Sequence, residues 1–157
     1  MRILLALLYV SLVGAPGGSS LPANDSFRNT IQSILNIGQI TLFHIKKLRT
    51  KLPAAPQMEF STPSIDGLTS ISRDLQILDN ELQNPVTDLL SQIQADVSSM
   101  EGRVRLFALT MGCPVQARPR GHPWASLFPD SHFYLILEKV QRYLDTIFLN
   151  KDKLKVC

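Results

Sequence analysis

The sequence is poor in cysteine, with only Cys113 and Cys157 among its 157 residues. Two cysteines are too few for a disulfide-rich scaffold, and their wide separation does not match a metal-binding or redox motif. The three histidines, His44, His122 and His132, are also far apart and lack the spacing of paired metal ligands. The sequence therefore predicts no metal site and no cofactor.

The chain also has only a small excess of charge of one sign. Lys and Arg total 16 and Asp and Glu total 13, which gives a net charge of +3, and only 18% of the residues are charged. So small an excess gives no reason to expect nucleic acid or anionic lipid as the main partner. The sequence also contains no nucleophile elbow, no phosphate-binding glycine loop and no paired catalytic carboxylates. We therefore expect no enzymatic activity.

Long hydrophobic runs are absent beyond the first residues of the chain. The one apolar run, residues 3–13, is followed by small residues over 14–20, which is typical of a secretory signal peptide. This run is shorter than the roughly 18 residues that a membrane-spanning helix requires. We expect a signal peptide over 1–20, cleavage after Ser20, and a secreted chain with no membrane insertion. The remaining residues, 21–157, suit one domain.

No stretch alternates polar and apolar residues as a β-strand does, whereas helical spacing of apolar residues is common. It predicts four helices, over residues 25–49, 65–83, 84–111 and 130–149. Asn24 or Asp25 caps the first helix, and Asp130 or Ser131 caps the fourth. The dipeptide Asn84-Pro85 suits a helix start and Gly112 suits a helix end, so together they delimit the third helix.

The predicted helices are joined by a long, a very short and a long connection. Proline-rich segments follow the first and third helices, while only Asn84-Pro85 separates the second from the third. A 15-residue extended segment spans up to about 50 Å, and the first helix is only about 37 Å long. Each long connection can therefore return to the starting end of the bundle. These lengths favour an all-α, up-up-down-down four-helix bundle over the up-down-up-down arrangement.

The two cysteines test this topology, because each follows one of the last two predicted helices. In the up-up-down-down arrangement these helices run the same way, so Cys113 and Cys157 come to the same pole. The other arrangement separates them by about a helix length, whereas a disulfide requires Cα atoms within roughly 7 Å. In an oxidising compartment we predict a disulfide between Cys113 and Cys157. A free thiol or an intermolecular bridge is the alternative.

Short motifs narrow the class of helical protein. They are Cys113 with the later Pro-Trp-Ala-Ser at 123–126, Cys157 as the final residue, Leu-Pro at 21–22, and Met-Glu-Phe at 58–60. With the signal peptide and the bundle topology, these motifs resemble the leptin family of long-chain helical cytokines. The sequence departs from that pattern because residues 114–121 separate Cys113 from the Pro-Trp-Ala-Ser motif. Such divergence indicates a leptin from a distant vertebrate, such as a fish.

This resemblance implies a monomeric secreted hormone. It implies binding and clustering of the leptin receptor, a class I cytokine receptor, and kinase and STAT signalling in energy balance and feeding. One receptor surface is implied on the first and third helices, at Ser33, Ile37, Gln92, Ser99 and Arg103. A second is implied on the first long loop and the start of the fourth helix, at Met58, Glu59, Phe60, Ser131 and His132.

Several alternatives stay open at this point. Another long-chain cytokine, of the growth-hormone or interleukin-6 group, is one, and a secreted carrier of a small ligand inside the bundle is a second. Ile37 and Ile40 lie off the core stripe, so the first long loop could cover them in place of a receptor. Phe60 could similarly pack into the bundle. Asn24 begins an Asn-Asp-Ser sequon and is a candidate glycosylation site.

Overall fold

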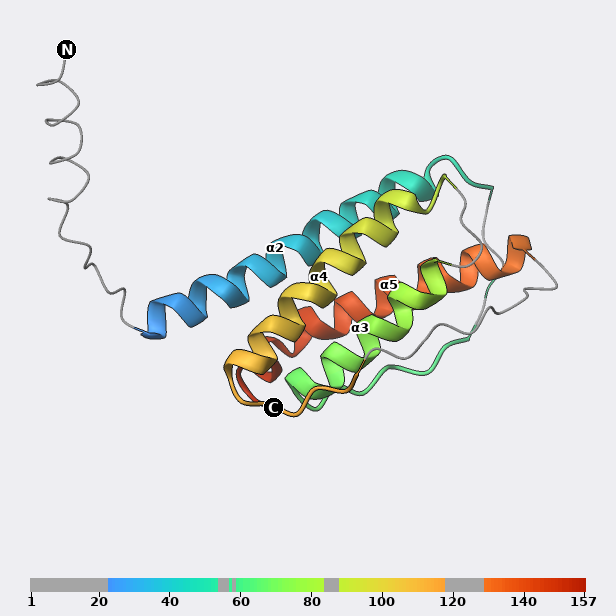
Figure 1. Cartoon of the computed structure of the whole chain (residues 1–157). Coiled ribbons are helices and arrows are strands. Elements are labelled where there is room, and N and C mark those ends of the chain that lie inside the picture. Colours follow the sequence, from blue (N-terminus) through green and yellow to red (C-terminus); the bar gives the residue numbers. More distant parts are fainter. Residues whose placement is uncertain (1–22, 54–56, 58, 84–87, 118–128) are drawn as a thin grey trace, which may run out of the picture.

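The computed structural model describes residues 23–53, 57, 59–83, 88–117 and 129–157. For residues 23 and 129–132 it describes the backbone alone. These residues form four α-helices: α2 (Ala23–Arg49), α3 (Leu68–Leu82), α4 (Ser91–Thr110) and α5 (Pro129–Leu149). A short 3₁₀ helix, η1 (Lys151–Lys155), follows α5. The described residues contain no β-strand, which confirms the all-α prediction (Figure 1).

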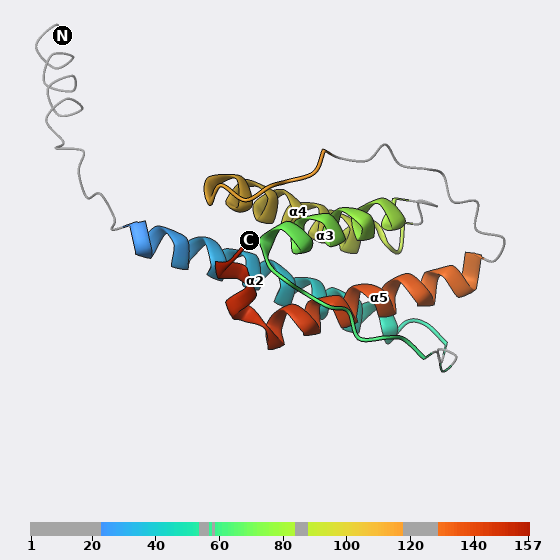
Figure 2. The ribbon, with the colours of Figure 1, turned by 90° about the horizontal axis from the view of Figure 1, so that it is seen from below.

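The helices α2 and α3 run in one direction, and α4 and α5 run in the opposite direction (Figure 1). Each of the first pair packs against both members of the second pair. Seen from below, α3 and α4 form one layer, and α2 and α5 form the other (Figure 2). The bundle therefore has the predicted up-up-down-down topology, in which every packed neighbour is antiparallel.

The start of α4 differs from the prediction. Asn84 and Pro85 lie outside the described residues, but Asp88 to Leu90 form a turn, and the α-helix begins only at Ser91. The hydroxyl of Ser91 donates a 2.7 Å hydrogen bond to the carbonyl of Asp88. Such local bonds from serine compete with helical backbone bonding, so the predicted helix start was too early.

The end of α4 agrees with the prediction. Gly112 has a φ of 73°, in the left-handed region that glycine adopts without a steric penalty. Its N–H donates to the carbonyl of Leu109, and the N–H of Cys113 donates to that of Ala108. These two bonds form the Schellman arrangement that satisfies the last carbonyls of a helix. The turn directs the chain so that Cys113 emerges at the bundle end.

The apolar stripes of the four helices meet in one core. Gly38, near the middle of α2, allows a close approach there, since a Cβ would lie 3.2 Å from Cζ of Phe148. Residues from every helix are fully buried, among them Ile34 and Ile45, Ile71 and Leu75, Ile93 and Met100, Ile136 and Leu144.

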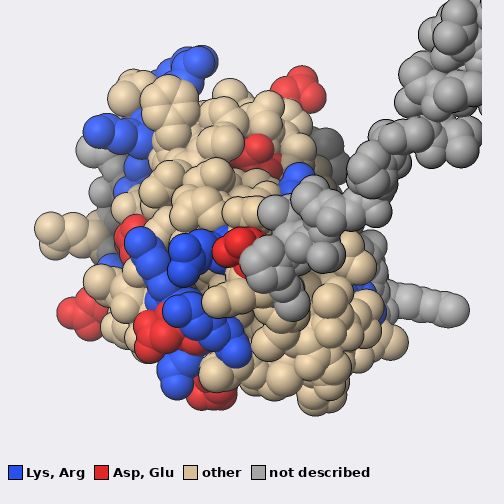
Figure 3. Space-filling view, turned by 90° about the vertical axis from the view of Figure 1, so that its left-hand side faces the viewer, with Lys and Arg blue, Asp and Glu red and all other residues tan. Residues whose placement is uncertain are grey.

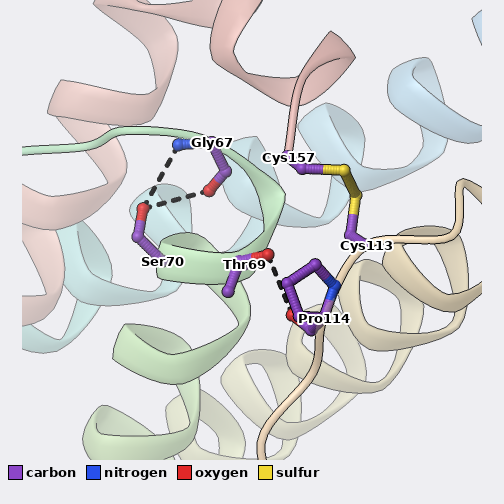
Figure 4. Close-up of a disulfide and its surroundings, with 6 residues drawn as sticks. All are labelled: Gly67, Thr69, Ser70, Cys113, Pro114 and Cys157. Carbon is purple, nitrogen blue, oxygen red and sulfur yellow. Dashed lines mark hydrogen bonds between the residues drawn. A yellow bond between two sulfur atoms is a disulfide. The ribbon is translucent and has the colours of Figure 1, made fainter.

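The disulfide joins Cys113 to Cys157, with Cα atoms 5.3 Å apart (Figure 4). The same pole holds the start of α3, because the N–H of Leu68 donates to Val156 and that of Thr69 donates to Cys157. The hydroxyl of Thr69 also donates to the carbonyl of Pro114, beside the disulfide. The predicted disulfide is therefore present, and it fastens α4 and the segment after α5 to the beginning of α3.

Candidate functional site

Of the five residues predicted on the first and third helices, the structure joins two, Arg103 and Ser33, directly. Ser33 and Ile37 lie on α2, and Gln92, Ser99 and Arg103 lie on α4, which packs antiparallel to α2. Nη1 of Arg103 donates a 2.7 Å hydrogen bond to Oγ of Ser33. One hydrogen bond thus joins two predicted residues from different helices. We call the exposed side of this helix pair the α2/α4 face.

A second polar link crosses the α2/α4 face. Nδ1 of His44 lies 2.5 Å from Oδ2 of Asp96, and Nε2 of Gln92 donates a 2.9 Å bond to the other Asp96 oxygen. The sequence pattern alone does not assign His44 or Asp96 to this face. The two residues are 52 positions apart, so only the packing of α2 against α4 reveals that they form a pair.

Apolar side chains lie beside these polar links. Ile37 is half-buried and packs against the core, whereas Ile40 is 51% exposed, so about half of the Ile40 side chain is left uncovered by the described residues. Leu106 on α4 is 67% exposed and borders a cavity of about 460 Å³ between the two helices, which Ser33 and Arg103 also line. Exposed apolar side chains beside fixed polar groups are typical of a binding surface.

The second predicted surface is only partly described. Met58 lies outside the described residues, and Ser131 and His132 lie in the first turn of α5 with their side chains outside them. Glu59 is exposed and Phe60 is half-buried. The guanidinium carbon of Arg142, on α5, lies 5.1 Å from the centre of the Phe60 ring, and Arg142 donates to the carbonyl of Phe60.

These contacts place Phe60 well along α5. Arg142 follows Ser131 by eleven residues, which corresponds to about 16 Å along a helix. Phe60 therefore lies about three turns away from the backbone of Ser131 and His132. Its packing agrees with the alternative that this aromatic ring is held against the bundle. The predicted second surface extends along α5 and is not one compact cluster.

Charged groups hold this region together. Arg49 at the end of α2 and Arg142 both donate to Glu138, over 2.6 and 2.7 Å. These hydrogen bonds hold the pKa of Glu138 below its ordinary value of 4.5. Nearby, the hydroxyl of Tyr143 donates to Asp74 on α3, and burial together with that carboxylate raises the pKa of Tyr143. The helix α5 is therefore fixed to both α2 and α3.

The remaining predictions concern modification, metals and membranes. Asn24 is exposed in the first turn of α2, so its side chain is accessible to glycosylation. No cluster of His, Cys, Asp and Glu that could hold a metal ion occurs in the described part of the chain. Within the same residues, no helix has the length and hydropathy needed to cross a membrane.

One comparison with known proteins agrees with this architecture, although no family model matches the chain. The chain is, however, 50% identical to the curated protein Leptin-B of the fish Oryzias latipes, in a 161-residue alignment that covers 100% of both chains. The similarity therefore extends over all four helices and both cysteines, not over an isolated motif.

Proposed function

This chain belongs to the leptin family, and from that premise we propose that it is a secreted hormone that binds and clusters the leptin receptor. Clustering of this class I cytokine receptor would trigger kinase and STAT signalling in energy balance and feeding. The observation that carries the proposal is the 50% identity to a leptin over the whole chain. Leptins are hormones and not enzymes, in agreement with the absence of catalytic motifs from the sequence.

Secretion is part of this proposal. Residues 1–20 have the features of a signal peptide, and the domain would then comprise 21–157. The disulfide between Cys113 and Cys157 supports an oxidising compartment, because such bonds persist in secreted proteins.

We place the main receptor contact on the α2/α4 face. The hydrogen bond between Arg103 and Ser33 and the link from His44 to Asp96 hold its polar groups in fixed positions. Ile40 and Leu106 supply exposed apolar area beside them. Pre-organised polar groups around apolar anchors reduce the entropy that binding costs. This face therefore suits a stable contact with one receptor ectodomain.

We place a second contact on the first long loop and the start of α5, at Glu59, Phe60, Ser131 and His132, with Met58. Its role would be to bring a second receptor chain into the complex. Arg142 supports this arrangement, because it holds Phe60 against α5 and so anchors the loop beside the helix.

The proposal is tested by measuring binding of the purified protein to the leptin-receptor ectodomain of the same species. We expect nanomolar affinity, and much weaker binding to ectodomains of the growth-hormone and interleukin-6 receptor groups. Tighter binding to either of those groups, or no binding to any cytokine-receptor ectodomain, would contradict the proposed function.

A further inference from the structure

A cavity of about 370 Å³ lies at the disulfide pole, where it shares Phe27 and Phe107 with the cavity beside the α2/α4 face. It is formed by the beginning of α2, the end of α4 and the short helix η1. Its walls include the apolar side chains of Phe27, Ile31, Phe107 and Met111, together with two basic residues, Arg28 and Lys155. We call it the polar-end cavity, because it lies at the disulfide pole of the bundle. Its volume is within the range of about 300–1,000 Å³ that is typical of small-molecule sites.

The apolar wall of the polar-end cavity is firmly held. The rings of Phe27 and Phe107 lie 5.8 Å apart, at a favourable tilted angle. Phe107 is only 4% exposed and belongs to the core, and Ile31 and Met111 pack against the same core. The half-buried side chains of Phe27, Ile31 and Met111 therefore give a preformed apolar surface, which the buried ring of Phe107 supports from beneath.

The basic residues of this cavity are not neutralised by the described residues. Arg28 and Lys155 are exposed, and neither forms an ion pair with another described side chain. No acidic side chain is among the described residues that line the cavity, although Asp152 belongs to η1. Figure 3 faces this pole and shows Lys and Arg side chains grouped on one side of it, with acidic side chains among them.

The cavity between α3 and α5 gives a useful contrast. It also has a volume of about 370 Å³ and contains several charged residues. There, however, Arg73 pairs with Asp74, Lys139 pairs with Glu81, and Arg142 pairs with Glu138 outside the lining. Of these two cavities, only the polar-end cavity combines an apolar wall with unpaired positive charge.

We propose that the polar-end cavity binds a small anionic amphiphile, of the medium-chain fatty-acid class. The hydrocarbon chain lies against the half-buried side chains of Phe27, Ile31 and Met111, and the carboxylate accepts hydrogen bonds from Arg28 and Lys155. Arginine and lysine form charge-assisted hydrogen bonds with carboxylates, and these are stronger than bonds between neutral groups. This proposal concerns a small ligand and not the receptor, and it does not depend on any receptor contact.

The test uses the full-length mature protein with its disulfide intact. Calorimetry and native mass spectrometry are used to measure binding of decanoate below its micellar concentration. We expect one decanoate per chain. Decanol supplies the chain without the charge and acetate supplies the charge without the chain, so both should bind at least about tenfold more weakly.

Two double variants identify the site. Arg28→Gln with Lys155→Gln removes both charges from the cavity, and we expect decanoate binding to weaken about tenfold or more. Lys46→Gln with Lys47→Gln is the matched control, because it removes the same charge at exposed positions near the other end of α2. This control should bind decanoate as the unmodified protein does. Circular dichroism and thermal unfolding verify that both variants remain folded.

Three outcomes would overturn the inference. They are absence of a 1:1 decanoate complex, equal binding of decanol and decanoate, and equal weakening in the two double variants. Because no receptor is present, failure here leaves the proposed hormone function unaffected, and failure of receptor binding leaves this site unaffected.

Discussion

Arg103 of α4 donates a 2.7 Å hydrogen bond to Ser33 of α2, although the two residues are 70 positions apart in the chain. The bond holds a long, otherwise mobile side chain in one orientation on the α2/α4 face. A fixed guanidinium next to exposed Leu106 resembles the arginine and apolar anchors that dominate many protein interfaces. The first prediction follows from this pair.

Replacing Arg103 with alanine should weaken binding to the leptin-receptor ectodomain by about tenfold or more, or at least about 1.4 kcal/mol, because arginine is enriched among the residues that dominate interface energies. Surface plasmon resonance measures the change. Arg73→Ala is the matched control, since Arg73 is also exposed but lies on α3. If both variants bind equally, the α2/α4 face is not the main contact.

Replacing Ser131 and His132 together with alanine should leave most of the receptor affinity intact and abolish signalling. The reason is that the proposed second surface recruits another receptor chain after the first has bound. Affinity is measured on the isolated ectodomain, and signalling is measured as STAT phosphorylation in cells expressing the receptor. A variant that signals normally would remove these residues from the proposed surface.

The disulfide should contribute strongly to stability. Cys113 and Cys157 are separated by 44 residues, and closing a loop of that length corresponds to roughly 4 kcal/mol in the chain-entropy model. Replacing both cysteines with serine should lower the free energy of unfolding by a comparable amount, measured by urea denaturation. A loss below about 1 kcal/mol would show that the unfolded chain is hardly restricted by the bridge.

Two glycine substitutions should have opposite effects on stability. In Gly67→Ala the new Cβ would overlap the backbone of Cys157, so the α3 start and the C-terminal residues would have to separate. We expect a loss of about 1–3 kcal/mol. Gly102 lies within α4, and a Cβ added there would meet no atom within 4 Å. The better helix propensity of alanine in Gly102→Ala should therefore stabilise the protein by up to about 1 kcal/mol. Thermal unfolding of the two variants measures the difference.

Stability should decrease in acid, partly through Glu138. Hydrogen bonds from Arg49 and Arg142 lower the pKa of its carboxyl in the folded state, so the ionised form stabilises the fold above the ordinary value of 4.5. This contribution is lost as the pH falls from 4.5 through the lowered value. Glu138→Gln should therefore reduce the slope of stability against pH in that range. An unchanged slope would indicate that the three side chains are not coupled in solution.

The topology was predictable because it depends on quantities that the sequence contains directly. The lengths of the connections and the positions of Cys113 and Cys157 favour one arrangement of four helices, and that arrangement is present. The helical spacing of apolar residues also indicates the core, since Ile34, Ile93 and Leu144, which follow that spacing, are all fully buried. These features rest on burial and chain length, which vary little with local detail.

Local hydrogen bonding was harder to predict. Asn84-Pro85 is a good helix start by composition, yet α4 begins at Ser91 after a turn stabilised by the Ser91 hydroxyl. A cap pattern describes what a residue is able to do, and the turn that forms depends on its neighbours. The same limit applies to the pair of His44 and Asp96, which exists only once α2 and α4 are in register.

Side-chain packing on the second surface could not be inferred from the resemblance to leptins. The motif around Phe60 indicated a loop near the start of α5, whereas the aromatic ring packs on Arg142, about three turns further along. Nothing in the sequence pairs these two residues, because the loop conformation decides which turn of α5 the ring meets.

The most direct test of the central claim, that the α2/α4 face binds the receptor, is hydroxyl-radical footprinting of the protein with and without the leptin-receptor ectodomain. Ile40 and Leu106 are 51% and 67% exposed, and both should become protected in the complex. Leu149, which is 84% exposed at the end of α5, should stay reactive and serves as the internal control. Unchanged reactivity of Ile40 and Leu106 in a saturated complex would contradict the account.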